Sequence, residues 1–223
     1  MTTEIIDAGT NARSRAFVLK GRKAVIVDTG FPGQADQILE TLRQNGIANK
    51  DVSLILLTHG HVDHYGNVRG LAKALGAPVA MGRADAAHLA RGHSAPVVPA
   101  SLPAAAFARL ARAPPETVKA DVPVDGELDL APYGVDAVAF ATPGHTRGSL
   151  SVLAGDACLI GDLLMALPVI GKVPGFPFFA EDRGQIGPSL KTVLDRGPRT
   201  LYPAHGVPCD AAVIGKKMAR LLG

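Results

Sequence analysis

Residues 54–64 of this chain read LILLTHGHVDH and change abruptly from apolar to polar. The first part, Leu54 to Leu57, is an uninterrupted apolar run. It is too short for a buried helix and long enough for a strand that is buried on both faces. The second part places three histidines and one aspartate directly after that strand. We therefore expect the rest of the chain to be arranged around a buried strand that ends in a cluster of polar side chains.

The spacing of these polar residues favours a metal site. In extended backbone, side chains two positions apart point the same way, so His59 and His61 can bind one ion together. Asp63 shares that parity, whereas His64 falls at the start of the next element and can turn toward a neighbouring ion. Imidazole and carboxylate are usual ligands of zinc and ferrous iron. The alternative is a polar loop that is rich in histidine without binding a metal.

Four further short motifs come at or just after strand-like runs. They are DTG at residues 28–30, TPGHT at 142–146, IGD at 160–162 and PAHG at 203–206. In this order, together with the T-H-x-H-x-D-H motif at 58–64, they resemble the metallo-β-lactamase superfamily, in particular its branch of glyoxalase II-like and lactonase-like hydrolases. The resemblance spans almost the whole chain.

The resemblance implies a set of metal ligands. A first ion would be bound by His59, His61 and His145, and a second by Asp63, His64 and His205, with Asp162 bridging the two ions. The implied cofactors are two divalent metal ions, with Zn²⁺ favoured over Fe and Mn. Asp28 is expected to support the ligands by accepting a hydrogen bond from a histidine N–H, or else to be a turn residue at a strand end.

The apolar runs and amphipathic stretches predict a layered α/β fold with mixed sheets. The resemblance makes this more specific, since it implies a four-layer αββα sandwich of two mixed β-sheets with helices outside. We expect residues 1–223 to form a single domain. The expected strands are residues 5–7, 16–19, 24–27, 54–57, 79–81, 127–130, 135–141, 149–153, 157–160 and 200–202. The expected helices are residues 34–44, 67–75, 83–91, 101–112, the later part of 182–196, and 210–222.

Composition limits the partners and the location. No apolar run is long enough to cross a membrane, and the first ten residues lack the features of a signal peptide. The two cysteines, Cys158 and Cys209, are not a disulfide framework. We therefore expect a cytoplasmic protein. The net charge of +3 is small, and the basic residues between Arg13 and Lys23 cross a hairpin, so we expect no nucleic-acid partner.

A pair of bridged ions predicts a hydrolase. Water held between the ions would be deprotonated near neutral pH, and this hydroxide would attack the carbonyl of an ester, a thioester or a lactone. Asp162 would bridge the ions and Asp63 would transfer a proton, so these two are the expected catalytic residues. The expected partner is therefore a small-molecule substrate.

Other functions are known on the fold that the resemblance implies. An iron-dependent persulfide dioxygenase uses a single iron, and a phosphodiesterase or nuclease would need an RNA-binding arm. True β-lactamase activity is disfavoured because those branches generally lack the bridging aspartate. A purely structural metal site is disfavoured because seven ligands around two ions leave coordination positions open.

The segment from Met165 to Ala180 is apolar and has neither helical nor strand periodicity. It follows Asp162 closely, so we expect it to form an apolar wall of the substrate pocket, with Phe176, Phe178 and Phe179 as its largest side chains. The alternative is an interface in a homodimer. Tyr65 and Arg147 also lie close to ligands in the sequence, and Arg147 is expected either to meet an anionic substrate group or to face solvent.

Overall fold

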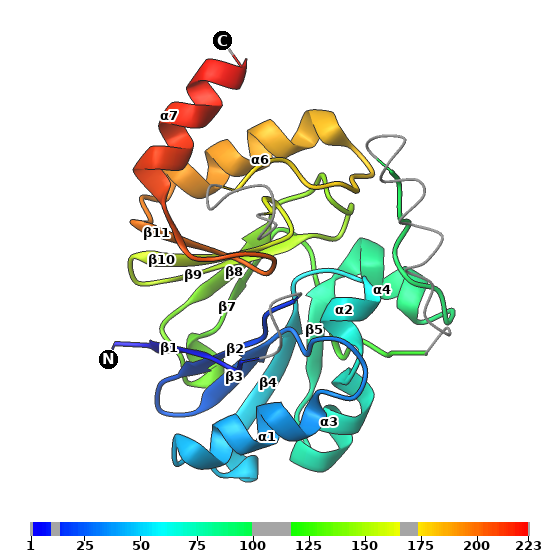
Figure 1. Ribbon diagram of the computed structural model, residues 1–223. Coiled ribbons are helices and arrows are strands. Elements are labelled where there is room, and N and C mark those ends of the chain that lie inside the picture. The colour runs from blue at the N-terminus through cyan, green and yellow to red at the C-terminus, as the bar shows by residue number, and fades with distance from the viewer. Residues whose placement is uncertain (1, 10–13, 100–116, 166–173, 223) are drawn as a thin grey trace.

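The computed structural model describes residues 2–9, 14–99, 117–165 and 174–222, with the backbone only for 218–222. Two six-stranded mixed sheets form its centre, and helices cover the outer face of each (Figure 1). The expected helix at residues 101–112 and part of the apolar segment, residues 166–173, lie outside the described residues.

The first sheet has the order β1-β2-β3-β4-β5-β6. Its strands are β1 Glu4–Asp7, β2 Phe17–Lys20, β3 Ala24–Val27, β4 Val52–Leu57, β5 Val79–Gly82 and β6 Val122–Val124. The first three strands pair antiparallel, and β3 to β6 run parallel to one another. The carboxyl ends of these four parallel strands therefore lie side by side along one edge of the sheet.

The second sheet has the order β12-β11-β10-β9-β8-β7. Its strands are β7 Glu127–Asp129, β8 Val138–Ala141, β9 Leu150–Ala154, β10 Ala157–Gly161, β11 Thr200–Pro203 and β12 Cys209–Asp210. All its pairs are antiparallel except β10 with β11, whose carboxyl ends therefore point the same way.

Three apolar cores fill the spaces between neighbouring layers. One core lies between the first sheet and the helices α1, α3 and α4, and another between the two sheets. The third joins the second sheet to α6 and α7. The helices are α1 Ala35–Gln44, α2 Val62–Tyr65, α3 Val68–Leu75, α4 Arg83–Leu89, α6 Arg183–Asp195 and α7 Ala211–Leu222, with short 3₁₀ turns at Asn49–Asp51 and Ala131–Tyr133. The αββα sandwich expected from the resemblance is confirmed.

Strand β4 shows why its sequence is a continuous apolar run. Successive side chains of a strand point to opposite faces. Leu54 and Leu56 accordingly lie in the core between the sheets, whereas Ile55 and Leu57 lie in the core beneath the helices. All four are fully buried. A strand with both faces covered needs apolar residues at every position, and it fixes the direction in which the polar residues after Leu57 continue.

Most expected elements are present, with ends shifted by a few residues, but three details differ. Strands β6 and β12 were not expected, because β6 contains Pro123 and β12 has only two residues. Pro123 is tolerated because β6 lies at the edge of its sheet. Helix α6 is helical from its start, and the side chain of Asp182 caps it by accepting a hydrogen bond from Gly184 N (2.9 Å).

No helix among the described residues is long and apolar enough to cross a bilayer.

Candidate metal centre

The candidate ligands lie just after the carboxyl ends of strands from both sheets. His59 and His61 follow β4, and Asp63 and His64 lie in the short helix α2. From the second sheet, His145 lies in the loop after β8, Asp162 follows β10, and His205 follows β11. The fold brings together all seven residues that the sequence proposed, and six of them, all except Asp63, are buried.

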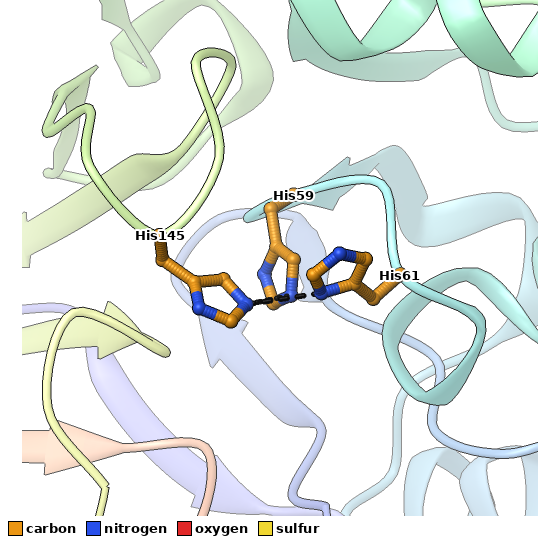
Figure 2. Close-up of side chains that lie close together, drawn as sticks. All are labelled: His59, His61 and His145. Carbon is orange, nitrogen blue, oxygen red and sulfur yellow. Dashed lines mark hydrogen bonds between the residues drawn. The ribbon is translucent and has the colours of Figure 1, made fainter. Parts of the chain in front are cut away.

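The first group consists of three imidazoles, and Figure 2 shows their nitrogens converging. His145 Nε2 lies 3.2 Å from His59 Nε2 and 3.0 Å from His61 Nδ1. The nitrogens of neutral imidazoles that face one another this closely can act as ligands of one cation. The inward nitrogen of His61 is Nδ1, whereas His59 and His145 each present Nε2.

The second group mixes imidazole with carboxylate. His205 Nε2 lies 3.1 Å from Asp63 Oδ2, and His64 Nε2 lies 3.7 Å from the same oxygen. In each set of possible metal ligands, the candidate ligand atoms lie within 4.8 Å of one another. One further set, which combines His59, His64 and Asp162, includes a histidine from each group.

Asp162 lies between the two groups. Its Oδ2 is 3.5 Å from His145 Nε2 in the first group and 3.3 Å from His205 Nε2 in the second. Its Oδ1 is 3.5 Å from His64 Nε2. One carboxylate therefore reaches histidines on both sides, as a bridging ligand must.

Buried polar atoms without partners test whether a metal fits here. His64 Nε2, His205 Nε2 and Asp162 Oδ1 have no hydrogen-bond partner among the described residues, although carboxylate and imidazole atoms lie close to them. An unsatisfied buried polar atom is costly, and such atoms are rare unless an ion or a water completes them. All three point into the same cluster of nitrogen and oxygen ligands, so a divalent cation fits the residues present.

The outer nitrogens of three of the histidines are held in place. His145 Nδ1 donates to the carbonyl of Phe179 (2.7 Å), and His61 Nε2 lies 3.4 Å from the carbonyl of Pro96. His64 Nδ1 donates to Asp28 Oδ2 (2.9 Å). A hydrogen bond at the outer nitrogen fixes the tautomer and leaves the inner nitrogen free for a metal.

Asp28 is therefore confirmed as an acceptor for a histidine N–H. The same carboxylate accepts from Thr58 N and from Thr58 Oγ1, both at 2.7 Å. Asp28 is also the one non-glycine residue with positive φ (62°) among those that the structure describes. Left-handed backbone costs energy for such a residue, and it occurs preferentially at functional sites.

Comparison with known proteins agrees with this geometry. The profile of the family described as "Metallo-beta-lactamase superfamily" matches residues 9–205 of the chain. The chain belongs to the metallo-beta-lactamase superfamily. The match includes every candidate ligand, from His59 to His205.

Among relatives in this superfamily, "Probable metallo-hydrolase MJ0888" of Methanocaldococcus jannaschii is 27% identical over 95% of this chain and 93% of its own. "Probable metallo-hydrolase YflN" of Bacillus subtilis is 24% identical over 82% of this chain and 75% of its own. Among solved structures, BLEG-1 B3 metallo-beta-lactamase superposes with a TM-score of 0.71 at 23% identity, and each chain is fully covered. At that identity the likeness establishes the fold alone.

The two groups of this superfamily site differ in charge. In the first group, burial lowers the pKa of His145 to about 4 and also lowers those of His59 and His61. Each of these imidazoles is therefore neutral near pH 7. A neutral imidazole is the form that binds a metal.

In the second group the carboxylates dominate. Burial disfavours the charged form of His205, but Asp162 and Asp63 outweigh it and raise the pKa of His205 to about 10. Burial likewise acts against charge on Asp63, whereas His64 and His205 lower the pKa of Asp63 to about 2. Without a metal, this group is therefore a network of charged pairs.

The structure corrects one expectation about the ligand segment. Asp63 was expected to continue the extended parity of His59 and His61, but Val62–Tyr65 is helical. The turn of α2 directs Asp63 and His64 to the second group, because a helix changes side-chain direction by about 100° per residue rather than by 180°.

Two neighbours of the ligands are also placed. Tyr65 is buried in the core beneath the helices, so it packs with the body of the protein. The side chain of Arg147 is 83% exposed, and its Nε lies 3.4 Å from Glu181 Oε2. Sequence reasoning missed Asp85, a fully buried carboxylate that accepts hydrogen bonds from both loops of the first group. No motif marks it, since its backbone partners are distant in the sequence.

Proposed function

We propose that this protein is a metal-dependent hydrolase that binds two divalent ions, with Zn²⁺ favoured, and cleaves an ester, a thioester or a lactone. Membership of the superfamily and the relatives named metallo-hydrolases support the metal-dependent hydrolase. The observation that carries the two-ion site is the position of Asp162, whose carboxylate lies within 3.5 Å of histidines of both groups.

We assign the ligands to the two ions as the resemblance implies. His59, His61 and His145 would bind one ion, and Asp63, His64 and His205 the other, while Asp162 would contribute to both. When bound, two such ions would supply a nucleophilic hydroxide at neutral pH and Lewis acidity for the carbonyl oxygen.

Two carboxylates of the chain, Asp63 and Asp162, are candidates for transferring a proton. Asp162 is nearly inaccessible, with 4% of its side chain exposed, whereas 19% of the Asp63 side chain is exposed. Asp63 is therefore the more reachable of the two carboxylates, and this supports Asp63 rather than Asp162 as the group that accepts a proton and passes it to the leaving group.

Apolar residues beside the first group support an apolar substrate portion. Phe179 forms a β-bridge with Pro99, and Ala180 N donates to Val98 O (2.9 Å), so residues 96–99 and 178–180 lie together. Both segments touch the first group, because Pro96 O and Phe179 O face its histidines. Val97 and Val98 are 37% and 41% exposed, and they can contact an acyl chain.

The contacts of the charged residues bear on the partners. Arg147 lies beside Glu181, and Arg15 lies 3.4 Å from Asp7, so neither residue offers an isolated positive charge. A small-molecule substrate without a nucleic-acid partner stays a prediction. A cytoplasmic location and a homodimer remain predictions.

The test is a stoichiometry combined with an assay. Protein purified without chelator should contain about two metal ions per chain by elemental analysis. The metal-replete protein should hydrolyse members of a panel of esters, thioesters and lactones, and chelation followed by Zn²⁺ should abolish and restore the activity. A single iron per chain with no hydrolysis would instead favour the persulfide dioxygenase. Cleavage of phosphodiesters alone would favour the nuclease.

A further inference from the structure

A buried carboxylate outside the ligand set contacts both loops of the first group. Asp85 lies in α4 and is fully buried. Its Oδ2 accepts hydrogen bonds from Gly60 N (2.7 Å) and from Thr146 Oγ1 (2.8 Å). Its Oδ1 accepts from Gly148 N (2.9 Å). All three donors therefore come from loops rather than from the helix that carries Asp85.

These donors lie next to the first group. Gly60 separates His59 from His61, and Thr146 directly follows His145. The loop with Gly60 extends from the first sheet, and the loop with Thr146 and Gly148 extends from the second. A backbone hydrogen bond from Leu150 N to Thr58 O (2.8 Å) also joins the two segments. Asp85 thus holds together the two chain segments from which the three imidazoles of Figure 2 project.

The backbone approaches Asp85 too closely for any side chain to intervene. A Cβ atom at Gly148 would lie 2.5 Å from Asp85 Cγ. A Cβ atom at Gly60 would lie 3.2 Å from Asp85 Cβ and 2.7 Å from Leu89 Cδ1. Because both positions are glycine, the two N–H groups reach the carboxylate directly. The contact therefore fixes the backbone of each loop, not merely a side chain.

Burying the Asp85 carboxylate costs more free energy than a contact that only stabilises the fold would require. Burial raises the pKa of Asp85, even though its three donors favour the ionised form. Burying a charge without an opposite charge costs free energy, and apolar packing would join two loops at lower cost. A carboxylate does what apolar packing cannot, since it accepts three directed hydrogen bonds at fixed angles.

We propose that Asp85 is a positioning residue for the first metal site, which sets the separation of His59 and His61 from His145 through the two loops. This inference rests on the proposed metal centre, but it does not depend on which bond the enzyme cleaves. Asp85 itself touches neither the ligand nitrogens nor the substrate space.

Asp85→Asn is the sharpest substitution. The amide has nearly the same shape as the carboxylate but keeps one acceptor oxygen, and its NH₂ group must face either Gly148 N–H or Gly60 N–H. One donor then opposes another across a hydrogen-bond distance, so one of the two loops must shift. Partners that hydrogen-bond a metal ligand directly typically change affinity by about 10- to 100-fold, and Asp85 acts one step further out, so the lower end of that range is expected.

The experiment separates the two metal groups. His205→Ala leaves the first group intact, and His61→Ala leaves the second. In each background, metal-free protein is titrated with Zn²⁺ against a chromophoric chelator, with and without Asp85→Asn. We expect Asp85→Asn to weaken Zn²⁺ binding by about tenfold in the His205→Ala background and by less than about twofold in the His61→Ala background.

Ser53→Ala is the matched control. The Ser53 hydroxyl donates to Ala24 O (3.1 Å) and Tyr133 O (2.6 Å), and so it joins segments of the two sheets near the start of β4. Its loss should lower the melting temperature without changing Zn²⁺ affinity in either background. Equal weakening by Asp85→Asn in both backgrounds, or none in the first, would overturn the inference.

A milder variant covers the case in which Asp85→Asn does not fold. Thr146→Val keeps the shape of the side chain and removes the hydroxyl that donates to Asp85. It should weaken Zn²⁺ by several-fold in the His205→Ala background alone, and an unchanged affinity there would contradict the inference. Wild-type protein that binds no Zn²⁺ would refute the metal centre and this inference together. Protein that binds Zn²⁺ but hydrolyses nothing would refute only the proposed function.

Discussion

The two halves of the metal centre are built from different chemistry. The first group has three imidazoles whose pKa values are lowered by burial, so it is neutral before any metal arrives. The second group pairs His64 and His205 with carboxylates that raise the pKa of both histidines. A cation can therefore enter the first group without releasing protons, whereas it must displace protons from the second.

The two halves also differ in what supports them. Outer nitrogens of the first group meet backbone carbonyls of Pro96 and Phe179, in segments outside the two sheets. The outer nitrogen of His64 meets Asp28, directly after β3. The position of the first group thus depends on the loops that contain Pro96 and Phe179. The position of His64 in the second group depends on the carboxylate of Asp28, which directly follows strand β3.

The largest effect is expected where the two halves meet. Asp162→Ala should remove the carboxylate that reaches both groups, so the variant should retain about one metal ion. Its kcat/KM should fall by about 1000-fold, because a catalytic metal supplies several kcal/mol of charge stabilisation. Elemental analysis and steady-state kinetics measure both, and the melting temperature should change far less. Two retained ions with near wild-type kcat would show that Asp162 does not bridge.

The next prediction concerns the pH dependence of metal-free protein. The pKa of His145 is lowered to about 4, so between about pH 6.5 and 4 the unfolded state binds more protons and stability falls as pH falls. The pKa of His205 is raised to about 10, so its contribution is complete below about pH 6.5 and is lost as pH rises through about 10. Stability should therefore be greatest near pH 6.5.

Each limb of that profile belongs to one half of the site. Urea unfolding of the metal-free protein measures it. At about 1.4 kcal/mol per pKa unit, His145 contributes about 3 kcal/mol to the acid limb and His205 about 5 kcal/mol to the alkaline limb. Because the pKa values of His59 and His61 are also lowered and that of His64 is also raised, His145→Gln should reduce the acid limb and His205→Gln the alkaline limb without abolishing either. If either variant flattened both limbs, the two groups would not titrate independently.

The resemblance supplied the ligand set, and it could be recognised because each ligand motif follows a strand in a fixed order. Strands β4, β8 and β10 are strongly apolar and β11 is less so, and the turns after them contain the ligand motifs. What sequence missed depends on distant backbone. Asp85 meets N–H groups of Gly60 and Gly148, and Asp28 adopts positive φ while accepting from Thr58. Neither contact leaves a periodic or local pattern.

The direction of Asp63 was missed for a local reason. The parity of extended backbone was carried past His61, but the chain begins a helix at Val62. His61 itself remains extended, with φ −97° and ψ 150°, so the parity holds for the two histidines and fails one residue later. A four-residue helix buries too few side chains to produce a detectable apolar period.

Asp28→Asn should affect the second half more than the first, because Asp28 bonds His64 directly and reaches His59 only through Thr58. It leaves His64 Nδ1 beside an amide in place of a carboxylate and removes one of the charges that raise the pKa of His64. We expect about 10- to 100-fold weaker Zn²⁺ binding in the His61→Ala background, as is typical of such partners, and a smaller change in the His205→Ala background. The order of the two effects is the reverse of that expected for Asp85→Asn. Equal weakening in both backgrounds would mean that Asp28 supports both halves of the site alike.

The smallest expected effect concerns the apolar segments beside the first group. Phe178 is half-buried and adjoins Phe179, whose carbonyl accepts from His145 Nδ1. If it lines the substrate space, Phe178→Ala should lower kcat/KM by about fivefold for long or bulky acyl groups and less for acetyl esters, because the loss scales with the apolar area contacted. Metal content and mass in solution should stay unchanged. Val213→Ala, which shortens an exposed apolar side chain on α7, is the control and should alter neither selectivity nor mass. A dimeric protein that became monomeric on Phe178→Ala, with its preference between short and long acyl groups unchanged, would assign this surface to an interface between two copies of the chain.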